Sequence, residues 1–199
     1  MMGEVSRRPG QEGEAAGVVS SGQHDPGKVS YGAFQLASSK QGAQQVLAFL
    51  KSPYGARWLN RFAGMDPTEP NGAFAQTWKA IARAEPQAFF AAQYAYIQQT
   101  HYQPAVAFVL AKSGVNLDAQ SVAVRNVVWS MAVQHGRGKH AILQAVQALK
   151  GVVNPSDPNY QKALIDELFK VRRAYVHNNS QLSPRYAREQ RDALAMVHD

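Results

Sequence analysis

One stretch near the N-terminus decides the fold of this chain: SSGQHDPGKVSYGAFQ, residues 20–35. Gly, Pro, Asp, Ser and Gln dominate it, and this composition disfavours a helix and favours tight turns around an exposed site. Asp25 lies between His24 and Pro26, on backbone that can hold a carboxylate at the edge of a cleft. Residues 31–35 then alternate aromatic and small side chains, which predicts a short strand with one solvent-exposed face.

The rest of the chain is predicted to be mainly helical. Residues 1–11 are expected to be irregular, and the residues up to about 16 to form a short helix or turn. Apolar spacing and Pro or Gly boundaries predict further helices over 41–51, 52–62, 74–83, 85–98, a resumed helix to 112, 122–133, 140–150, 160–173 and 183–198. Pro104 is expected to interrupt the helix that starts at 85. The fold class is therefore α+β, mostly α, with about eight helices and a short N-terminal β segment.

The residues 122–133 are apolar on nearly every side, which predicts a buried central helix with Trp129 in the core. His135 follows this helix, and its simplest role is to cap the C-terminal end, where the helix dipole favours a cation.

Composition limits the possible partners. At 199 residues and 45% apolar side chains, the chain suffices for one compact domain, predicted over residues 1–199. It contains no cysteine, which excludes disulfides, a zinc ribbon and a cysteine nucleophile. The formal net charge of +7 favours polyanionic partners such as a bacterial cell wall, an anionic membrane or nucleic acid. Because the basic residues do not cluster on one helix, nucleic-acid binding is the weaker prediction.

Two further classes are not predicted. No apolar run is long enough to cross a bilayer, and no apolar stretch follows Arg7 and Arg8 as in a secretory signal. The six histidines include no His-x-x-x-His pair with a catalytic glutamate, so no metal ligand is assigned.

Carboxylates near the N-terminus could support cleavage of a glycosidic bond. That reaction needs an acid to protonate the leaving oxygen and a second carboxylate to stabilise the oxocarbenium ion, attack it or activate water. The candidates are Glu14, or alternatively Glu12, as the acid and Asp25 as the second carboxylate. An apolar wall beside the glutamate would raise its pKa and keep it protonated. By spacing alone, solvated surface acids are the competing interpretation.

Several motifs carry a family resemblance. They are VSSG at 19–22, DPG at 25–27, VSYGAFQL at 29–36, FLKSP at 49–53, THY at 100–102 and VVWSMAVQHG at 127–136. In these motifs the chain resembles the lysozyme-like domain at the C-termini of type VI secretion spike proteins and related peptidoglycan-degrading effectors. Residues 32–35 also resemble the Gly-x-x-Gln element of goose lysozymes and lytic transglycosylases. The resemblance runs from about Glu12 to the last predicted helix.

The resemblance implies a lysozyme-like muramidase that needs no cofactor, with Asp25 matching the family's aspartate. An ungapped alignment places Gly10 where relatives carry the acid, so Glu12 or Glu14 must supply it, and Glu14 is our choice. Tyr31 and Gln35 are implied to contact sugar hydroxyls, with a packed ring and a satisfied backbone as the structural alternatives. His135 is implied to support the cleft.

The resemblance also implies a setting. The protein would be made in the cytoplasm and act as an antibacterial effector in the periplasm of a target bacterium, delivered by a secretion apparatus or released during phage lysis. Implied partners are peptidoglycan, a secretion spike component and a cognate immunity protein. The alternative is a catalytically silent module of the same fold, which binds peptidoglycan or adapts to the spike.

Overall fold

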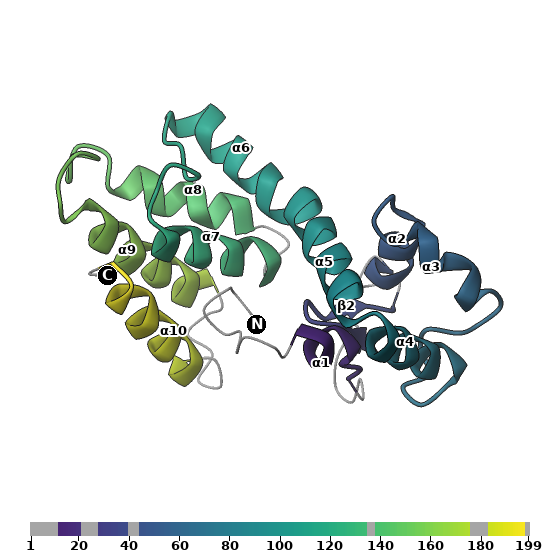
Figure 1. Cartoon of the computed structure of the whole chain (residues 1–199). Coiled ribbons are helices and arrows are strands. Elements are labelled where there is room, and N and C mark those ends of the chain that lie inside the picture. Colours follow the sequence, from purple (N-terminus) through teal and green to yellow (C-terminus); the bar gives the residue numbers. More distant parts are fainter. Residues whose placement is uncertain (1–11, 21–27, 40–43, 135–137, 176–182, 198–199) are drawn as a thin grey trace. The chain divides into compact units, whose positions relative to one another are not determined.

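The computed structural model describes residues 12–20, 28–39, 44–134, 138–175 and 183–197 (Figure 1). Helices dominate these residues, and the strands form a two-stranded antiparallel sheet. The predicted class, α+β and mostly α, is therefore confirmed. Among the described residues, no helix combines the length and the apolar character needed to cross a bilayer.

The elements follow one another in this order: α1 (Glu12–Gly17), β1 (Ser30–Tyr31), β2 (Leu36–Ala37), α2 (Gln45–Lys51), α3 (Ala56–Leu59), η2 (Asn60–Phe62), α4 (Ala73–Ala84), α5 (Pro86–Ile97), η3 (Gln98–Tyr102), α6 (Gln103–Ser113), α7 (Val122–Gln134), α8 (Gly138–Ala148), α9 (Tyr160–Tyr175) and α10 (Ser183–Ala195).

The chain divides into two compact units, with the boundary between Gln98 and Gln99. The N-terminal unit holds the elements from α1 to α5, and the C-terminal unit holds those from α6 to α10. A single lysozyme-like domain over residues 1–199 stays a prediction.

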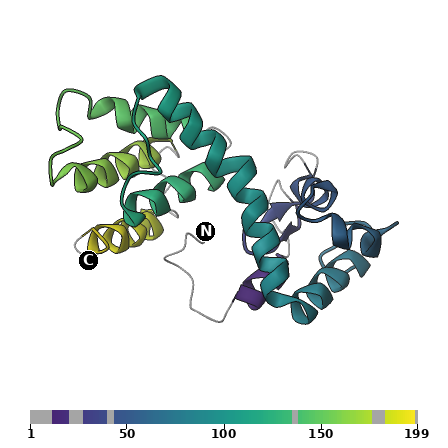
Figure 2. The ribbon, with the colours of Figure 1, turned by 45° about the horizontal axis from the view of Figure 1, so that its top comes forward.

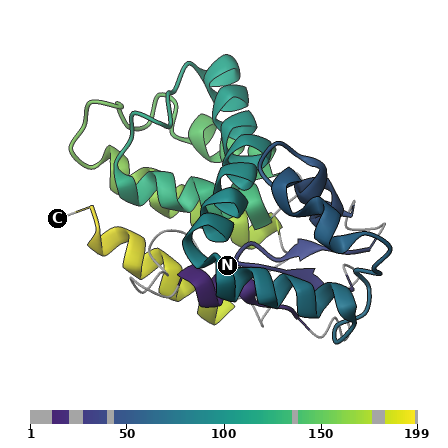
Figure 3. The ribbon, with the colours of Figure 1, turned by 45° about the vertical axis from the view of Figure 1, so that its right-hand side comes forward.

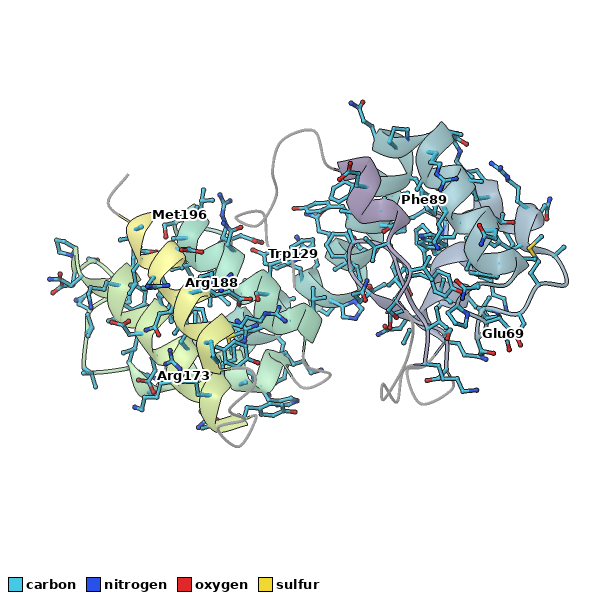
Figure 4. The ribbon with its side chains drawn as sticks, turned by 90° about the horizontal axis from the view of Figure 1, so that it is seen from below. Glu69, Phe89, Trp129, Arg173, Arg188 and Met196 are labelled. Carbon is cyan, nitrogen blue, oxygen red and sulfur yellow. The ribbon has the colours of Figure 1, made fainter. Side chains whose placement is uncertain are left out.

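Aromatic rings form the core of the N-terminal unit. Trp78 on α4 is fully buried and packs edge to face against Phe89 of α5, with ring centres 4.6 Å apart. The rings of Tyr31 and Phe49 lie 5.3 and 5.9 Å from that of Trp78. Phe89 is labelled in Figure 4. Large buried rings supply much of the apolar area of a core, so this cluster fixes α4, α5, α2 and β1 on one another.

The sheet is shorter than the predicted strand. Ser30 pairs with Ala37 and Tyr31 with Leu36, and residues 32–35 form the turn between the two strands (Figure 3). Gly32 and Gln35 have φ values of 75° and 54°. These values lie in the left-handed region, which is incompatible with the extended backbone of a strand. The strand expected over 31–35 is therefore wrong in extent, because its alternating side chains belong to a buried turn in which only Gln35 is exposed.

The start of one helix differs from the expectation, and an expected interruption is present. The helix expected to start at Pro53 begins at Ala56, after a turn in which the Ser52 hydroxyl donates to the Phe49 carbonyl at 2.6 Å. The expected interruption near Pro104 is confirmed as the π-helical segment Gln98–Tyr102. Pro104 is the second residue of α6, directly after this π-helical segment, so the helical backbone continues although Pro104 donates no hydrogen bond.

The C-terminal unit is built around α7, as the apolar run predicted. Val124, Val128 and Met131 are fully inaccessible, and Trp129 is 7% exposed and stacked 5.2 Å from the ring of Tyr102. The helix contacts α8, α9 and α10, the green and yellow helices of Figure 2. The prediction of a buried central helix with Trp129 in the core is confirmed.

Candidate functional site

The C-terminal end of α1 is fastened to α4 and α5 through one carbonyl. Trp78 Nε1 and Gln93 Nε2 both donate to the carbonyl oxygen of Ala16, at 2.7 and 3.2 Å. The last carbonyls of a helix have no intrahelical partner, so these buried donors satisfy a group that would otherwise be stranded. Figure 1 shows α1 beside α4 and α5. This short helix is thereby held by the core of the unit.

Gln93 joins α1 to the turn between the strands. Its side chain is completely buried, and its Oε1 accepts from the Ala33 amide at 3.1 Å while its Nε2 reaches Ala16. A single carboxamide provides both an acceptor and a donor, which is what these two backbone groups require. The residue was not identified from the sequence, where its one signal is a polar side chain on an aromatic-rich helix.

Gly32 is packed against this carboxamide. A methyl group at Gly32 would overlap Gln93 Oε1 and lie 2.8 Å from Gln93 Cδ and 3.1 Å from Trp78 Cζ2. The backbone also has a φ of 75°, which disfavours any side chain. The turn therefore needs glycine for two separate reasons.

Replacing Gly32 with alanine should lower the free energy of unfolding by about 2 kcal/mol, from backbone strain and overpacking together. The matched control is Gly64→Ala, because Gly64 has a φ of 74° and nothing within 4 Å of an added methyl. Urea unfolding of both variants separates the steric part from the strain. Equal losses in the two variants would show that Gln93 does not restrict this turn.

The described residues that precede and follow the Asp25 segment are hydrogen-bonded to each other. Ser20 N donates to the Ser30 carbonyl at 2.9 Å, and Ser30 N donates to Ser20 Oγ at 2.8 Å. The Gly32 amide donates to the Val18 carbonyl at 2.7 Å. Asp25 itself lies outside the described residues, as does His135. The flanks of the Asp25 segment are nevertheless joined to each other and follow directly on α1.

The two candidate acids lie on α1. Glu14 is exposed, and Glu12 is the first residue of the helix, its side chain lying outside the described residues. Glu14 lies two residues before Ala16, whose carbonyl is held by Trp78 and Gln93, and the Glu14 side chain is open to solvent.

Tyr31 is completely buried against Phe74 and Trp78, and its hydroxyl donates to the Pro67 carbonyl at 2.7 Å. Burial, together with the negative charge of Asp66, raises the pKa of Tyr31 well above its ordinary value. This geometry matches the structural alternative of a packed ring. Contact with a sugar would require the ring to leave that packing.

Gln35 differs from Tyr31 in being exposed at the end of the turn. Its Nε2 donates to the Gly32 carbonyl at 2.9 Å, which is the expected backbone role. The remaining face of the carboxamide is accessible, so contact of Gln35 with a sugar stays a prediction.

Asp66 is a further polar group near β1, next to Pro67, whose carbonyl accepts from Tyr31. Its Oδ1 accepts from the amide and the hydroxyl of Thr68, both at 2.8 Å. These two hydrogen bonds, led by the backbone amide and assisted by the charge of Lys28, hold the pKa of Asp66 below its usual range. In the described parts of the chain, no three acidic or histidine side chains are grouped to hold a metal ion.

Comparison with known proteins identifies the family of this chain. The model of the family "Type VI secretion system spike protein VgrG3-like, C-terminal" matches residues 2–192. A curated relative, the type VI secretion system spike protein VgrG3 of Vibrio cholerae serotype O1, is 28% identical over 145 residues. The match covers 73% of this chain but only 13% of that relative. The chain belongs to the family of VgrG3-like C-terminal regions of type VI secretion spike proteins.

Proposed function

We propose that this chain hydrolyses the glycan strands of peptidoglycan, as a lysozyme-like effector of a type VI secretion system. The observation that carries the proposal is the joining of α1, which precedes the Asp25 segment, to the two-stranded sheet that follows it. Gln93 binds both the end of α1 and the turn at Ala33, and Ser20 and Ser30 close the base of the Asp25 segment. These contacts join the helix that carries Glu14 to the residues on both sides of the Asp25 segment, which supports the proposed pair.

In this mechanism the glutamate protonates the glycosidic oxygen as the bond breaks. Asp25 stabilises the developing oxocarbenium ion, or attacks it, or activates water, depending on the separation of the two carboxyl groups. Formation of an anhydro sugar without water is the lytic-transglycosylase outcome of the same pair. Gln35, which is exposed at the end of the turn between β1 and β2, would contact sugar hydroxyls.

Which glutamate acts as the acid depends on which of the two carboxyl groups is removed from solvent. A general acid must stay protonated near neutral pH, and burial in an apolar environment is what raises the pKa of a carboxyl group. Glu14 is exposed, so its role requires bound substrate to cover it. Glu12, the first residue of the same helix, is the alternative.

Of the separate Glu14→Gln and Glu12→Gln variants, one should lose most of its activity and the other should keep it. Loss of the general acid lowers turnover by about 100-fold or more, whereas removal of an exposed carboxylate that is not used changes it little. Release of soluble fragments from purified peptidoglycan gives the rate, and each variant serves as the matched control for the other. Full activity in both variants would contradict an acid on α1.

Delivery by the spike apparatus to the periplasm of a target bacterium would place the enzyme at its substrate. A producing cell would need an immunity protein, and acidic residues on that partner would suit the charge of +7. A silent peptidoglycan-binding or spike-adaptor module is the second candidate, which the exposure of Glu14 favours. Sedimentation with cell walls without product release would identify that module.

A further inference from the structure

The peptide group between Gly32 and Ala33 forms hydrogen bonds on both of its sides. Its N–H, which belongs to Ala33, donates to Gln93 Oε1 at 3.1 Å. Its carbonyl, which belongs to Gly32, accepts from Gln35 Nε2 at 2.9 Å and from the Gln35 amide at 3.2 Å. One peptide group therefore connects a buried carboxamide on α5 with an exposed carboxamide at the end of the turn.

This peptide group needs a partner outside the turn to keep its orientation. Gly32 has a φ of 75°, and glycine adopts positive and negative φ values about equally readily. Rotation of the peptide plane would turn the Gly32 carbonyl away from Gln35 and the Ala33 N–H away from Gln93. Because a buried N–H without an acceptor is unfavourable, the hydrogen bond to Gln93 favours the observed orientation.

The Gln93 side chain is itself held in one orientation. It is completely buried and lies one helical turn after Phe89, which Figure 4 labels on α5. Its Nε2 donates to the Ala16 carbonyl at 3.2 Å, the same oxygen that accepts from Trp78 Nε1. Exchanging the oxygen and the nitrogen of the carboxamide would place a donor against the Ala33 N–H and an acceptor against the Ala16 carbonyl. These two backbone groups therefore decide which atom of Gln93 faces the turn.

We propose that Gln93 is a positioning residue for Gln35: it binds the Ala33 N–H and thereby directs the Gly32 carbonyl at the Gln35 side chain, which is presented to a sugar hydroxyl in a fixed orientation. The sugar part of this inference rests on the proposed function. Gln93 is buried and acts through the peptide group, without touching the glycan. A carboxamide that is oriented before the ligand arrives loses less conformational entropy on binding.

The test uses Gln93→Met and Gln35→Ala, singly and together, in the full chain. Methionine is close to glutamine in length, but it offers the Ala33 N–H no comparable acceptor and donates nothing to Ala16. On soluble glycan strands, Gln93→Met should raise KM by about three- to tenfold, because the hydrogen bond of Gln35 to the sugar is weakened. A contact made equally in the bound substrate and the transition state leaves kcat unchanged. In the Gln35→Ala background, Gln93→Met should raise KM no further.

Gln93→Glu tests the same hydrogen bonds through pH, and it keeps the test available if methionine impairs folding. A protonated carboxyl group accepts from Ala33 and donates to Ala16 as glutamine does, whereas a carboxylate only accepts. Burial raises the pKa of a carboxyl group, so the protonated form should dominate at about pH 5. The KM of this variant, divided by that of the wild type at the same pH, should be near one at about pH 5 and should rise by about pH 8. This division cancels the titration of the charged side chains on the helices that pack against α5: Glu12, Glu14, Lys79 and Arg83.

Gln87→Met is the matched control, because Gln87 is exposed on the same helix. A readout without substrate is the NMR order parameter of the Gln35 side-chain amide, which should fall in Gln93→Met and stay at the wild-type value in the control. An unchanged order parameter, an unchanged KM in an active protein, or KM increases that multiply in the double variant would overturn the inference. A lower order parameter in Gln93→Met, when the wild type cleaves no peptidoglycan, would retain the positioning role and reject the proposed reaction.

Discussion

Asp25→Asn should lower the rate of glycan cleavage by at least about 100-fold, because the developing oxocarbenium ion loses its negative partner or the water loses its base. Asparagine has nearly the same shape as aspartate but carries no charge and accepts no proton. The flanks of the segment, joined through Ser20 and Ser30, do not depend on this side chain. We therefore expect the unfolding midpoint to stay close to that of the wild type.

The control for this variant is Asp157→Asn, an exposed aspartate in the C-terminal unit. Its Oδ1 accepts from the Asn159 amide at 2.7 Å, a bond that asparagine can keep. Cleavage should remain at the wild-type level in the control. Wild-type activity in Asp25→Asn would remove Asp25 from the mechanism, whatever the behaviour of the two glutamates.

Arg172→Met should destabilise the C-terminal unit by about 3 kcal/mol, because removing one partner of a buried ion pair leaves the other uncompensated. Arg172 is completely buried, and its guanidinium donates to Glu189 Oε2 at 2.7 Å and to Ser130 Oγ at 3.0 Å. It also lies 4.2 Å from the ring centre of Tyr186. These bonds join α9 to α7 and α10. In the variant, Glu189 still pairs with Arg185, so the expected loss lies at the lower end of the range for broken buried ion pairs.

The pH dependence of this loss follows from Glu189. Burial alone would raise its pKa, but the charge of Arg172 and the bonds to Arg185 outweigh burial and lower it. The stability that Glu189 contributes is present above its unfolded pKa of about 4.3 and is lost as the pH falls through the lower folded value. The difference between wild type and Arg172→Met should therefore narrow below about pH 4.

Tryptophan fluorescence contains a signal from each unit. Trp129 lies in the C-terminal unit, and Trp58 and Trp78 lie in the N-terminal unit. The matched control is Lys170→Met on the same helix, because Lys170 is exposed and its ion pair with the half-buried Glu167 should contribute less than about 1 kcal/mol. Equal midpoints for Arg172→Met and Lys170→Met would contradict a stabilising role for the buried pair.

The helices were largely predictable because their signals are local. The apolar run at 122–133 predicted a buried helix, and Val124 and Met131 are fully inaccessible in α7. The residues that organise the units were not predictable in this way. Gln93 reaches Ala16 across 77 positions, and Arg172 reaches Ser130 across 42. Such pairings depend on which helices meet, which the spacing within one helix does not encode.

In the candidate site, too, the local motif was predictable from the sequence and the long-range contacts were not. Residues 25–36 were recognisable as a motif, but the burial of Tyr31 and the carbonyl that its hydroxyl binds follow from packing against α4 and the turn at Pro67. Asp66 has no motif and becomes visible only through that contact. Local chemistry thus points to a candidate segment, and tertiary packing decides which of its side chains are exposed.

Mass analysis of the products of purified peptidoglycan is the most direct test of the proposed activity. Digestion by the wild-type protein should release fragments with reducing muramic ends, and Asp25→Asn should release none above background. Anhydro-muramic ends would keep glycan-strand cleavage and change the outcome to that of a lytic transglycosylase. An intact glycan after digestion by folded wild-type protein, which sediments with the wall, would contradict the proposed hydrolysis and establish a binding module.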